Sequence, residues 1–191
     1  MVTVLYTGND MKILDALKNY KTPFQEEENF VKQTIAFIEN NPNAFERTNL
    51  SGHVNGSAWV LSKDGKRSLL NFHKKLNRWL QFGGHSDGNP DTWAVALREA
   101  VEETGMHDLS FVMTDIFDVD VHTIPENLKK GEPEHLHYDI RFLLRAQSDD
   151  FVVSEESKLL KWVNNDDIPT LYKKGEINLS MYRMYQKLLS L

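Results

Sequence analysis

The sequence predicts a protein of the α/β (α+β) class, in which a mixed sheet packs between helices. Three observations support this prediction. Residues 11–20 and 25–40 have helical periodicity, the chain from residue 53 onward alternates between strands and turns, and one prominent helix interrupts those strands. The length of 191 residues fits one domain with an appended segment. We therefore expect residues 1–50 to form a helical extension packed on a domain formed by residues 51–191.

The N-terminal helices are predicted from their apolar spacing. Val31, Ile35 and Ile38 recur at helical intervals within 25–40, and a polar segment, Asn41-Pro42-Asn43, ends that helix. Three roles stay open for these helices. They could cover the sheet, close over a cleft, or form a contact between two copies of the chain in a homodimer.

The body of the chain is predicted to be a series of strands around one central helix. The first two strands form a hairpin through the turn at residues 63–66, because Asp-Gly between apolar runs favours a tight turn. A third apolar run leads directly into Gly83-Gly84. The predicted elements after residue 50 are strands at 57–62, 67–72 and 79–82, a helix at 92–104, strands at 110–122, 135–146 and 158–163, and a helix at 178–191.

Composition excludes several classes of function. The chain is 40% hydrophobic and 26% charged and has a net charge of −6, so bulk attraction to nucleic acid or to an anionic membrane is not expected. It has no cysteine, which excludes disulfides and thiolate zinc sites. Neither a signal peptide nor a membrane-spanning segment is recognisable, and we expect a cytoplasmic protein.

The central helix at residues 92–104 has two contrasting sides. At about 100° per residue, Ala94, Leu97 and Val101 fall on one side, which we expect to face the core. The acidic residues of the helix fall together on the opposite side; they are Glu99, Glu102 and Glu103. Asn89 or Asp91 is the expected N-cap and Gly105 the expected C-terminal stop.

The three glutamates suggest a site for a hard cation. Like charges three or four residues apart destabilise an isolated helix by about 0.2–0.5 kcal/mol per pair, and a divalent ion would offset that repulsion. Mg²⁺ prefers oxygen ligands from carboxylates, water and substrate phosphates. Gly83-Gly84 lets the backbone approach a ligand closely, and Arg98 can orient Glu102 one turn later. The alternative is an ordinary solvated acidic face.

This segment resembles the signature of the Nudix hydrolases, a family whose members share a mixed curved sheet between helices. The resemblance covers residues 84–106 directly. One position departs from the pattern, since Pro90 stands where the first glutamate is expected; Asp87 or Asp91 could take its place in bracing the loop and Arg98. The residues that match are Gly84, Arg98, Glu99, Ala100, Glu102, Glu103, Gly105 and Met106.

The resemblance implies metal-dependent hydrolysis of a diphosphate linkage in a nucleoside diphosphate attached to another group. The cofactor would be Mg²⁺ or Mn²⁺, and the partner a small nucleotide-type molecule. The implied metal ligands are Glu99, Glu102, Glu103 and a carbonyl oxygen of Gly83 or Gly84; the implied catalytic residues are Arg98, Glu102 and Glu103. Glu155 or Glu156 is the candidate general base, although an exposed acidic turn explains that pair equally well.

A histidine-rich strand supplies the candidate substrate-binding residues. Within residues 135–146, alternation places His135, His137, Asp139 and Arg141 on one face. That face could line the substrate cleft, bind a transition metal through its H-x-H-x-D pattern, or be exposed to solvent. His85 follows the diglycine and is expected near the metal and the phosphates. The predicted substrate-binding residues are His85, His135, His137, Asp139 and Arg141.

Two other functions compete with hydrolysis. A Nudix-like module could bind a nucleotide metabolite without turning it over, and Pro90 is the feature that favours this reading. An acidic interaction domain without a metal is the second alternative.

Overall fold

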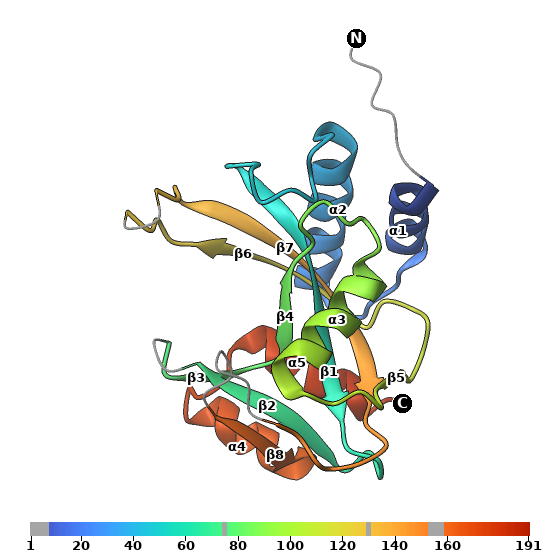
Figure 1. The fold of residues 1–191 in the computed structure, drawn as a ribbon, viewed down its shortest axis with the longest axis vertical. Coiled ribbons are helices and arrows are strands. Elements are labelled where there is room, and N and C mark those ends of the chain that lie inside the picture. The colour runs from blue at the N-terminus through green and yellow to red at the C-terminus, as the bar shows by residue number, and fades with distance from the viewer. Residues whose placement is uncertain (1–7, 74–75, 129–130, 153–158) are drawn as a thin grey trace.

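The computed structural model describes residues 8–73, 76–128, 131–152 and 159–191 (Figure 1). Within these ranges no helix combines the length and the apolar character needed to cross a membrane. The helices are α1 (Gly8–Asn19), α2 (Gln25–Asn40), α3 (Thr92–Thr104), α4 (Ile168–Lys173) and α5 (Leu179–Leu188), with a 3-10 turn at Asn165–Asp167. The strands are β1 (Gly52–Leu61), β2 (Arg67–His73), β3 (Arg78–Leu80), β4 (Phe82–His85), β5 (Ser110–Phe111), β6 (Asp118–Ile124), β7 (His135–Arg145) and β8 (Leu160–Asn164).

The eight strands form one mixed sheet. Its main path runs β3-β2-β1-β7-β5, while β4 pairs with β1, β6 with β7 and β8 with β2. The β1–β7 pair is parallel and extends from Gly52 opposite Leu136 to Leu61 opposite Arg145, whereas the other pairs are antiparallel. All ten residues of β1 are buried, as expected of a strand with neighbours on both sides and helices over the sheet.

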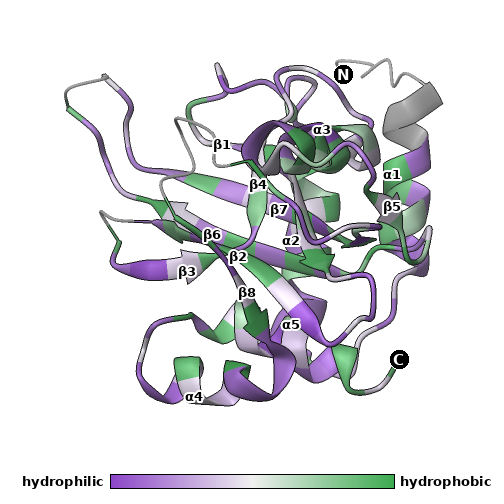
Figure 2. Cartoon of the chain, turned by 60° about the horizontal axis from the view of Figure 1, so that its bottom comes forward, coloured by the Kyte–Doolittle hydropathy of each residue, from purple (hydrophilic) through white to green (hydrophobic). Residues whose placement is uncertain are grey.

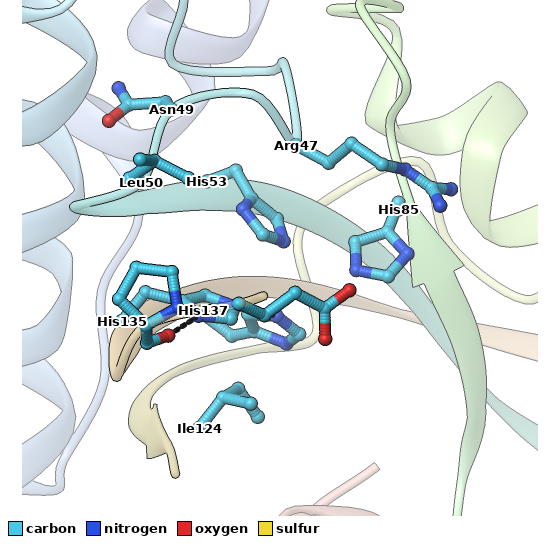
Figure 3. A pocket seen from close by; sticks show the side chains of 10 residues that line it. Arg47, Asn49, Leu50, His53, His85, Ile124, His135 and His137 are labelled. Carbon is cyan, nitrogen blue, oxygen red and sulfur yellow. Dashed lines mark hydrogen bonds between the residues drawn. The ribbon is translucent and has the colours of Figure 1, made fainter. Parts of the chain in front are cut away.

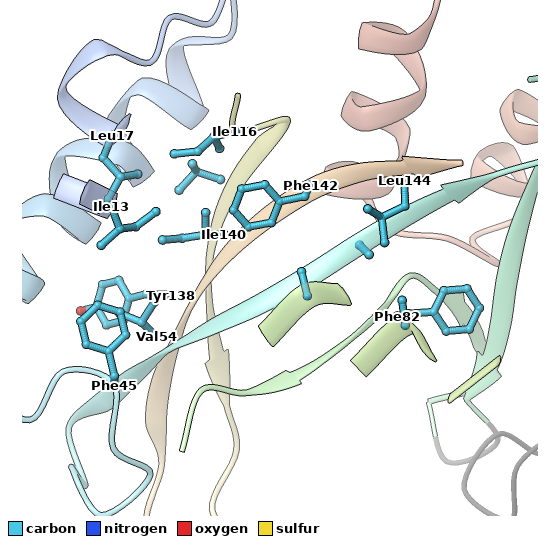
Figure 4. Close-up of a cluster of buried hydrophobic side chains, with 14 of the residues drawn as sticks. Ile13, Leu17, Phe45, Val54, Phe82, Ile116, Tyr138, Ile140, Phe142 and Leu144 are labelled. Carbon is cyan, nitrogen blue, oxygen red and sulfur yellow. The ribbon is translucent and has the colours of Figure 1, made fainter. Parts of the chain in front are cut away.

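Helices cover both faces of the sheet, which confirms the predicted fold class. One face packs against α1, α2 and α3 in a hydrophobic cluster that includes Val54, Ile140 and Phe142 (Figure 4). The opposite face packs against α4 and α5 in a second cluster that includes Trp59 and Leu143. Helices α1 and α3 each carry hydrophobic and hydrophilic residues side by side, the pattern of helices with one buried side (Figure 2).

The N-terminal helices share the core of the strands. Ile13 and Leu17 of α1 and Ile38 of α2 belong to the same cluster as β1 and β7, and the rings of Phe37 and Tyr138 stack with their centroids 4.1 Å apart. Glu27 of α2 is fully buried, and its carboxylate accepts a hydrogen bond from the Val119 backbone at 2.9 Å. These contacts place the helices over the sheet, one of the three roles considered for them.

Several elements differ from their predicted form. The segment 110–122 was expected to be one strand, yet it holds the two-residue β5 and then β6, separated by residues 112–117. Strand β1 begins five residues earlier than expected, at Gly52 instead of Ser57. The short α4 was not predicted, because six residues beginning with Ile168-Pro169 are too few to show helical periodicity.

Candidate active site

Helix α3 begins and ends where the sequence predicts. The Asp91 side chain accepts a hydrogen bond from the Ala94 backbone N–H at 3.1 Å and so satisfies one of the exposed donors of the first turn. Gly105 has φ 67°, and its N–H donates to the Val101 carbonyl at 2.8 Å. A residue with a Cβ would be strained at that φ, so glycine suits this stop.

The buried side of α3 is not the one predicted. Val95, Ala96 and Ala100 face the core, whereas Ala94 is exposed and Leu97 and Val101 are only half-buried. The cause is the close approach of α3 to β1 at Gly56. A Cβ there would lie 2.7 Å from the Thr92 carbonyl oxygen, closer than real Cβ contacts. Small residues on both elements therefore let the helix settle on the strand.

Two of the three glutamates consequently point toward the diglycine of β4. A Cβ on Gly84 would lie 2.4 Å from Glu99 Oε2, and the Glu99 side chain is only 16% exposed. Glu103 accepts hydrogen bonds from the Gly83 backbone N–H at 3.0 Å and from Asn71 Nδ2 at 2.9 Å. Glu102 is 59% exposed. The expectation that all three lie opposite the buried side is therefore wrong for Glu99 and Glu103.

Arg98 connects this acidic cluster to the loop before α3. Its Nη2 lies 2.8 Å from Glu99 Oε1, and its Nη1 lies 3.5 Å from Glu102 Oε2. Nη2 also donates to the His85 carbonyl oxygen at 2.9 Å. One guanidinium thus offsets part of the carboxylate repulsion and holds the loop against the helix.

The loop that contains Pro90 is held by a different set of contacts from those expected. Asp87 forms a two-pronged ion pair with Arg47, at 2.6 and 2.9 Å, and the Gly88 N–H donates to the Phe45 carbonyl. Asp91 is engaged as the cap of α3. Neither aspartate is bonded to Arg98 in place of the absent glutamate, and the loop is tied instead to residues 41–51.

The side chains around the diglycine have the oxygen atoms that a hard cation prefers as ligands. Glu99, Glu102 and Glu103 offer only oxygen donors, and the close packing at Gly84 leaves the Glu99 carboxylate beside the backbone. Their oxygens do not converge on one point as placed, because Glu103 turns to Gly83 and Glu102 to solvent. Glu155 and Glu156, the candidate bases, lie outside the described residues.

A polar face of the sheet lies beside this cluster. The pairing register puts His53 of β1 opposite His137 of β7, and His137 opposite His122 of β6. His85 of β4 lies opposite Asn55, two residues along β1 from His53. Directly paired residues share a face of the sheet, so side chains from four strands meet here. The predicted alternation of β7 is confirmed, since Tyr138, Ile140 and Phe142 lie in the hydrophobic cluster on the other face.

Further along this face, Arg141 is enclosed by carboxylates. Its side chain is 2% exposed and bonds to Asp139 at 2.7 Å and to Asp118 and Asp120 at 3.0 Å each. Arg183 of α5 also bonds to Asp118, at 2.8 Å. Substrate binding by Arg141 is therefore not supported, because its donors are used within the core.

The histidines predicted to bind substrate line a pocket of about 180 Å³ (Figure 3). His85, His135 and His137 border it together with Arg47, Glu132 and His53. A second pocket of about 200 Å³ shares His85 and His137 and continues to Gly83, Gly84 and Asp139. The two pockets thus connect the histidines to the diglycine.

His53 occupies a central place that the sequence did not indicate. Its ring is tilted against those of His85, His135 and His137, with centroids 4.6–5.1 Å apart. Burial lowers the pKa of His53 to about 4 and that of His137 to about 2, and it also lowers the pKa of His85. Burial therefore favours the neutral form of His53, His85 and His137. Only the pairing of β1 with β7 reveals this role, and a single sequence does not show which strands pair.

Comparisons with known proteins support the fold. A scan against family models finds no match, and no curated protein matches. Solved structures do match: a NUDIX-family hydrolase from Clostridium perfringens has 24% identity and a TM-score of 0.51, covering 71% of this chain and 95% of its own. An Ap4A hydrolase from C. elegans in a binary complex has 21% identity and a TM-score of 0.55, covering 72% and 95%.

A third match is the E. coli dihydroneopterin triphosphate pyrophosphohydrolase, with 16% identity, a TM-score of 0.51 and coverage of 72% and 96%. All three matches extend over nearly the whole of the matched chain, so the likeness concerns a complete domain. The family resemblance read from residues 84–106 and the matched architecture agree. The chain has the fold of the Nudix hydrolases.

Proposed function

We propose that this protein hydrolyses a diphosphate linkage in a nucleoside diphosphate attached to another group, with Mg²⁺ or Mn²⁺ as cofactor. The observation that carries the proposal is the packing of Glu99 and Glu103 against Gly83-Gly84 within a Nudix fold. The signature residues and the matched architecture support the same chemistry. Residues 51–191 would form the hydrolase unit, with residues 1–50 as an extension that completes its core.

The charge distribution supports the need for a divalent ion. Among the described residues that line the two pockets, Arg47 is the sole permanent cation, and Asp87 already neutralises it. A diphosphate entering this cleft would meet carboxylates and histidines, and the pKa values of His53, His85 and His137 are lowered by burial. When bound, Mg²⁺ or Mn²⁺ neutralises phosphate charge and lowers the pKa of a water molecule. We therefore expect substrate binding to depend on the metal.

Named residues divide the remaining work. Glu99, Glu102 and Glu103, with a carbonyl of Gly83 or Gly84, would hold the metal. Arg98 would position Glu99 and Glu102 through the contacts already described. His85, His135 and His137 would orient the substrate from the connected pockets, whereas the buried Asp139, which is bonded to Arg141 and Gln81, would only shape the second pocket. The neighbours named for Ap4A and for dihydroneopterin triphosphate support a substrate with a phosphate chain.

The experiment is a turnover screen. Nucleoside diphosphate compounds are incubated with the protein and Mg²⁺ or Mn²⁺, and phosphate is measured after phosphatase coupling. We expect Glu102→Gln to lower kcat by at least about a hundredfold without loss of fold, because it removes the charge of a proposed metal ligand at an exposed position. Glu28→Gln, an exposed glutamate of α2, is the matched control. Normal turnover by Glu102→Gln would contradict the metal assignment.

Pro90 keeps one alternative in view, a module that binds a nucleotide metabolite without cleaving it. Metal-dependent binding of a compound in the screen, measured by calorimetry and accompanied by no phosphate release, would favour that module over the hydrolase.

A further inference from the structure

We propose a second metal site, for a transition-metal ion of the zinc class, held by His53, His85 and His137. One potential ligand nitrogen from each of these residues lies within 4.8 Å of the other two. Among the described residues, no other group of three or more potential metal-ligating side chains comes this close together. The three rings converge on the pocket from separate strands (Figure 3).

The backbone fixes the positions from which these side chains extend. His53 and His137 are directly paired between the parallel strands β1 and β7, while His85 belongs to β4 on the other side of β1. Hydrogen-bonded strands hold their Cα and Cβ atoms more rigidly than loops do, which favours a preformed set of metal ligands. Ligands of a tetrahedral Zn²⁺ lie about 3.3 Å apart, given bond lengths of roughly 2.0–2.1 Å. Ring rotations would therefore have to close the widest separation by about 1.5 Å.

His53 provides an independent indication of a ligand. The residue is 3% exposed, and neither ring nitrogen meets a partner at full hydrogen-bond geometry among the described residues, although the Asn49 backbone interacts with the ring. A buried polar group without a partner costs about 1–3 kcal/mol, so most such groups in folded proteins are satisfied. A metal ion bound between the three rings would take the lone pair of the unprotonated nitrogen of His53.

The surroundings of His137 supply the support that metal-binding histidines usually have. Its Nδ1 lies 2.8 Å from the Asn55 amide, and the Asn55 Oδ1 has no other partner among the described residues. Binding through Nε2 requires the proton on Nδ1, and with its amide group flipped Asn55 accepts a hydrogen bond from that N–H through Oδ1. Beside it, His135 donates from Nδ1 to the Pro133 carbonyl at 2.8 Å, which leaves a lone pair on Nε2. That Nε2 is 3.3 Å from His137 Nε2, so His135 lies at the edge of the three-histidine group.

The donor atoms select the kind of metal. Neutral imidazoles suit Zn²⁺, Co²⁺ or Ni²⁺, whereas Mg²⁺ prefers the oxygen donors of the α3 cluster. Glu132 and Arg47 are the charged residues among those described around this pocket, so a bound ion would make it strongly positive. Its role rests on the proposed function: the ion would attract an anionic group of the substrate to the part of the cleft lined by the histidines.

Metal binding is tested on the full chain without a histidine tag, after treatment with chelator and dialysis. Co²⁺ is titrated and its visible spectrum recorded, because four- or five-coordinate Co²⁺ with nitrogen ligands absorbs far more strongly than the hydrated ion. We expect one Co²⁺ per chain, displaced by an equivalent of Zn²⁺ and unaffected by excess Mg²⁺. A spectrum identical to that of hydrated Co²⁺ would overturn the proposal.

Variants locate the site. His53→Gln and His85→Ala should each weaken Co²⁺ binding by at least about a hundredfold, while His107→Ala, an exposed histidine after α3, should bind normally. Because His53 is buried, circular dichroism and a thermal melt check its fold, and the half-buried His85 provides a second test. Equal binding by all three folded variants would refute the assignment.

Failure of this inference can be distinguished from failure of the proposed function. Glu102→Gln should lose hydrolysis and keep Co²⁺ binding. A chain that binds Co²⁺ through these histidines but cleaves no diphosphate compound would contradict only the hydrolase. A chain that cleaves such compounds with Mg²⁺ but shows no nitrogen-bound Co²⁺ would contradict only the histidine site.

Discussion

Gly84→Ala should separate the geometry of the acidic cluster from the stability of the fold. The new Cβ would lie 2.4 Å from Glu99 Oε2, while an ordinary contact needs about 3.4 Å, so the carboxylate must move by about 1 Å. Gly84 does not have a positive φ, and the backbone accepts alanine without strain. A displacement of about 1 Å in a catalytic group can cost about a hundredfold in rate, equivalent to about 2.7 kcal/mol in the barrier.

The stability of Gly84→Ala should change by less than about 1 kcal/mol. The colliding atoms belong to the end of a flexible side chain, and the substitution also restricts the unfolded chain slightly. The assay pairs kcat for the best substrate of the screen with urea unfolding. Gly56→Ala is the informative contrast, because its Cβ would meet the Thr92 backbone and the Val95 side chain. That overpacking should lower the free energy of unfolding by about 1–3 kcal/mol.

A double-mutant cycle tests the cause. Glu99→Asp shortens the side chain by one carbon–carbon bond, about 1.5 Å, and withdraws it from the new methyl group. In the Glu99→Asp background, Gly84→Ala should then have little further effect on kcat. Full activity of Gly84→Ala alone, or an unchanged hundredfold loss in the Glu99→Asp background, would refute the reasoning that contact with Glu99 transmits the effect.

Three further predictions concern the polar face of the sheet. Arg141→Met should lower the free energy of unfolding, measured by urea unfolding, by about 3–5 kcal/mol, since it takes from three buried carboxylates a cation that bonds to each of them. Burial opposes the negative charge on Asp120, but Arg141 outweighs burial and holds the pKa of Asp120 below its usual range. The free energy of unfolding should therefore fall as the pH drops below about 4, and it should fall less steeply in Asp120→Asn. His137→Ala should raise KM more than it lowers kcat, measured with the best substrate of the screen.

Each of these predictions has its own control or contrary outcome. Arg78→Met removes an exposed arginine of β3 and should leave urea unfolding almost unchanged. The sign of the pH effect follows because the unfolded aspartate binds its proton near pH 3.9 and the folded one only at lower pH. Parallel acid-unfolding slopes for wild type and Asp120→Asn would contradict it. An unchanged KM in His137→Ala would remove that residue from the cleft.

The sequence predicted α3 well because local signals define both of its ends. Asp91 caps the first turn and Gly105 stops the last one, and both act within a few residues. Its buried side was mispredicted because that side is decided by a distant partner. Gly56 and Gly84 lack side chains, so the side of the helix that carries Glu99 and Glu103 can pack closely against their strands. Hydrophobicity along the helix contains no information about glycines on neighbouring strands.

The roles of Arg141 and His53 could not be predicted from the sequence, for a related reason. Alternation along β7 correctly put Arg141 on the polar face, yet its burial depends on Asp118 and Asp120 of β6 and on the cover given by α5. His53 acquires its place only through pairing with His137. Such long-range pairings follow from the whole topology, whereas spacing within a segment reports local structure.

The parallel pairing of β1 and β7 has a consequence for how the molecule acquires its chemistry. Parallel neighbours cannot be joined by a tight turn, and here the intervening chain includes β2 to β6 and α3. Closing so large a loop is entropically costly and slows folding. The histidine rings can therefore meet only after most of the chain has been organised. A ligand that binds all of these rings at once would bind only the folded protein and would therefore stabilise it against unfolding.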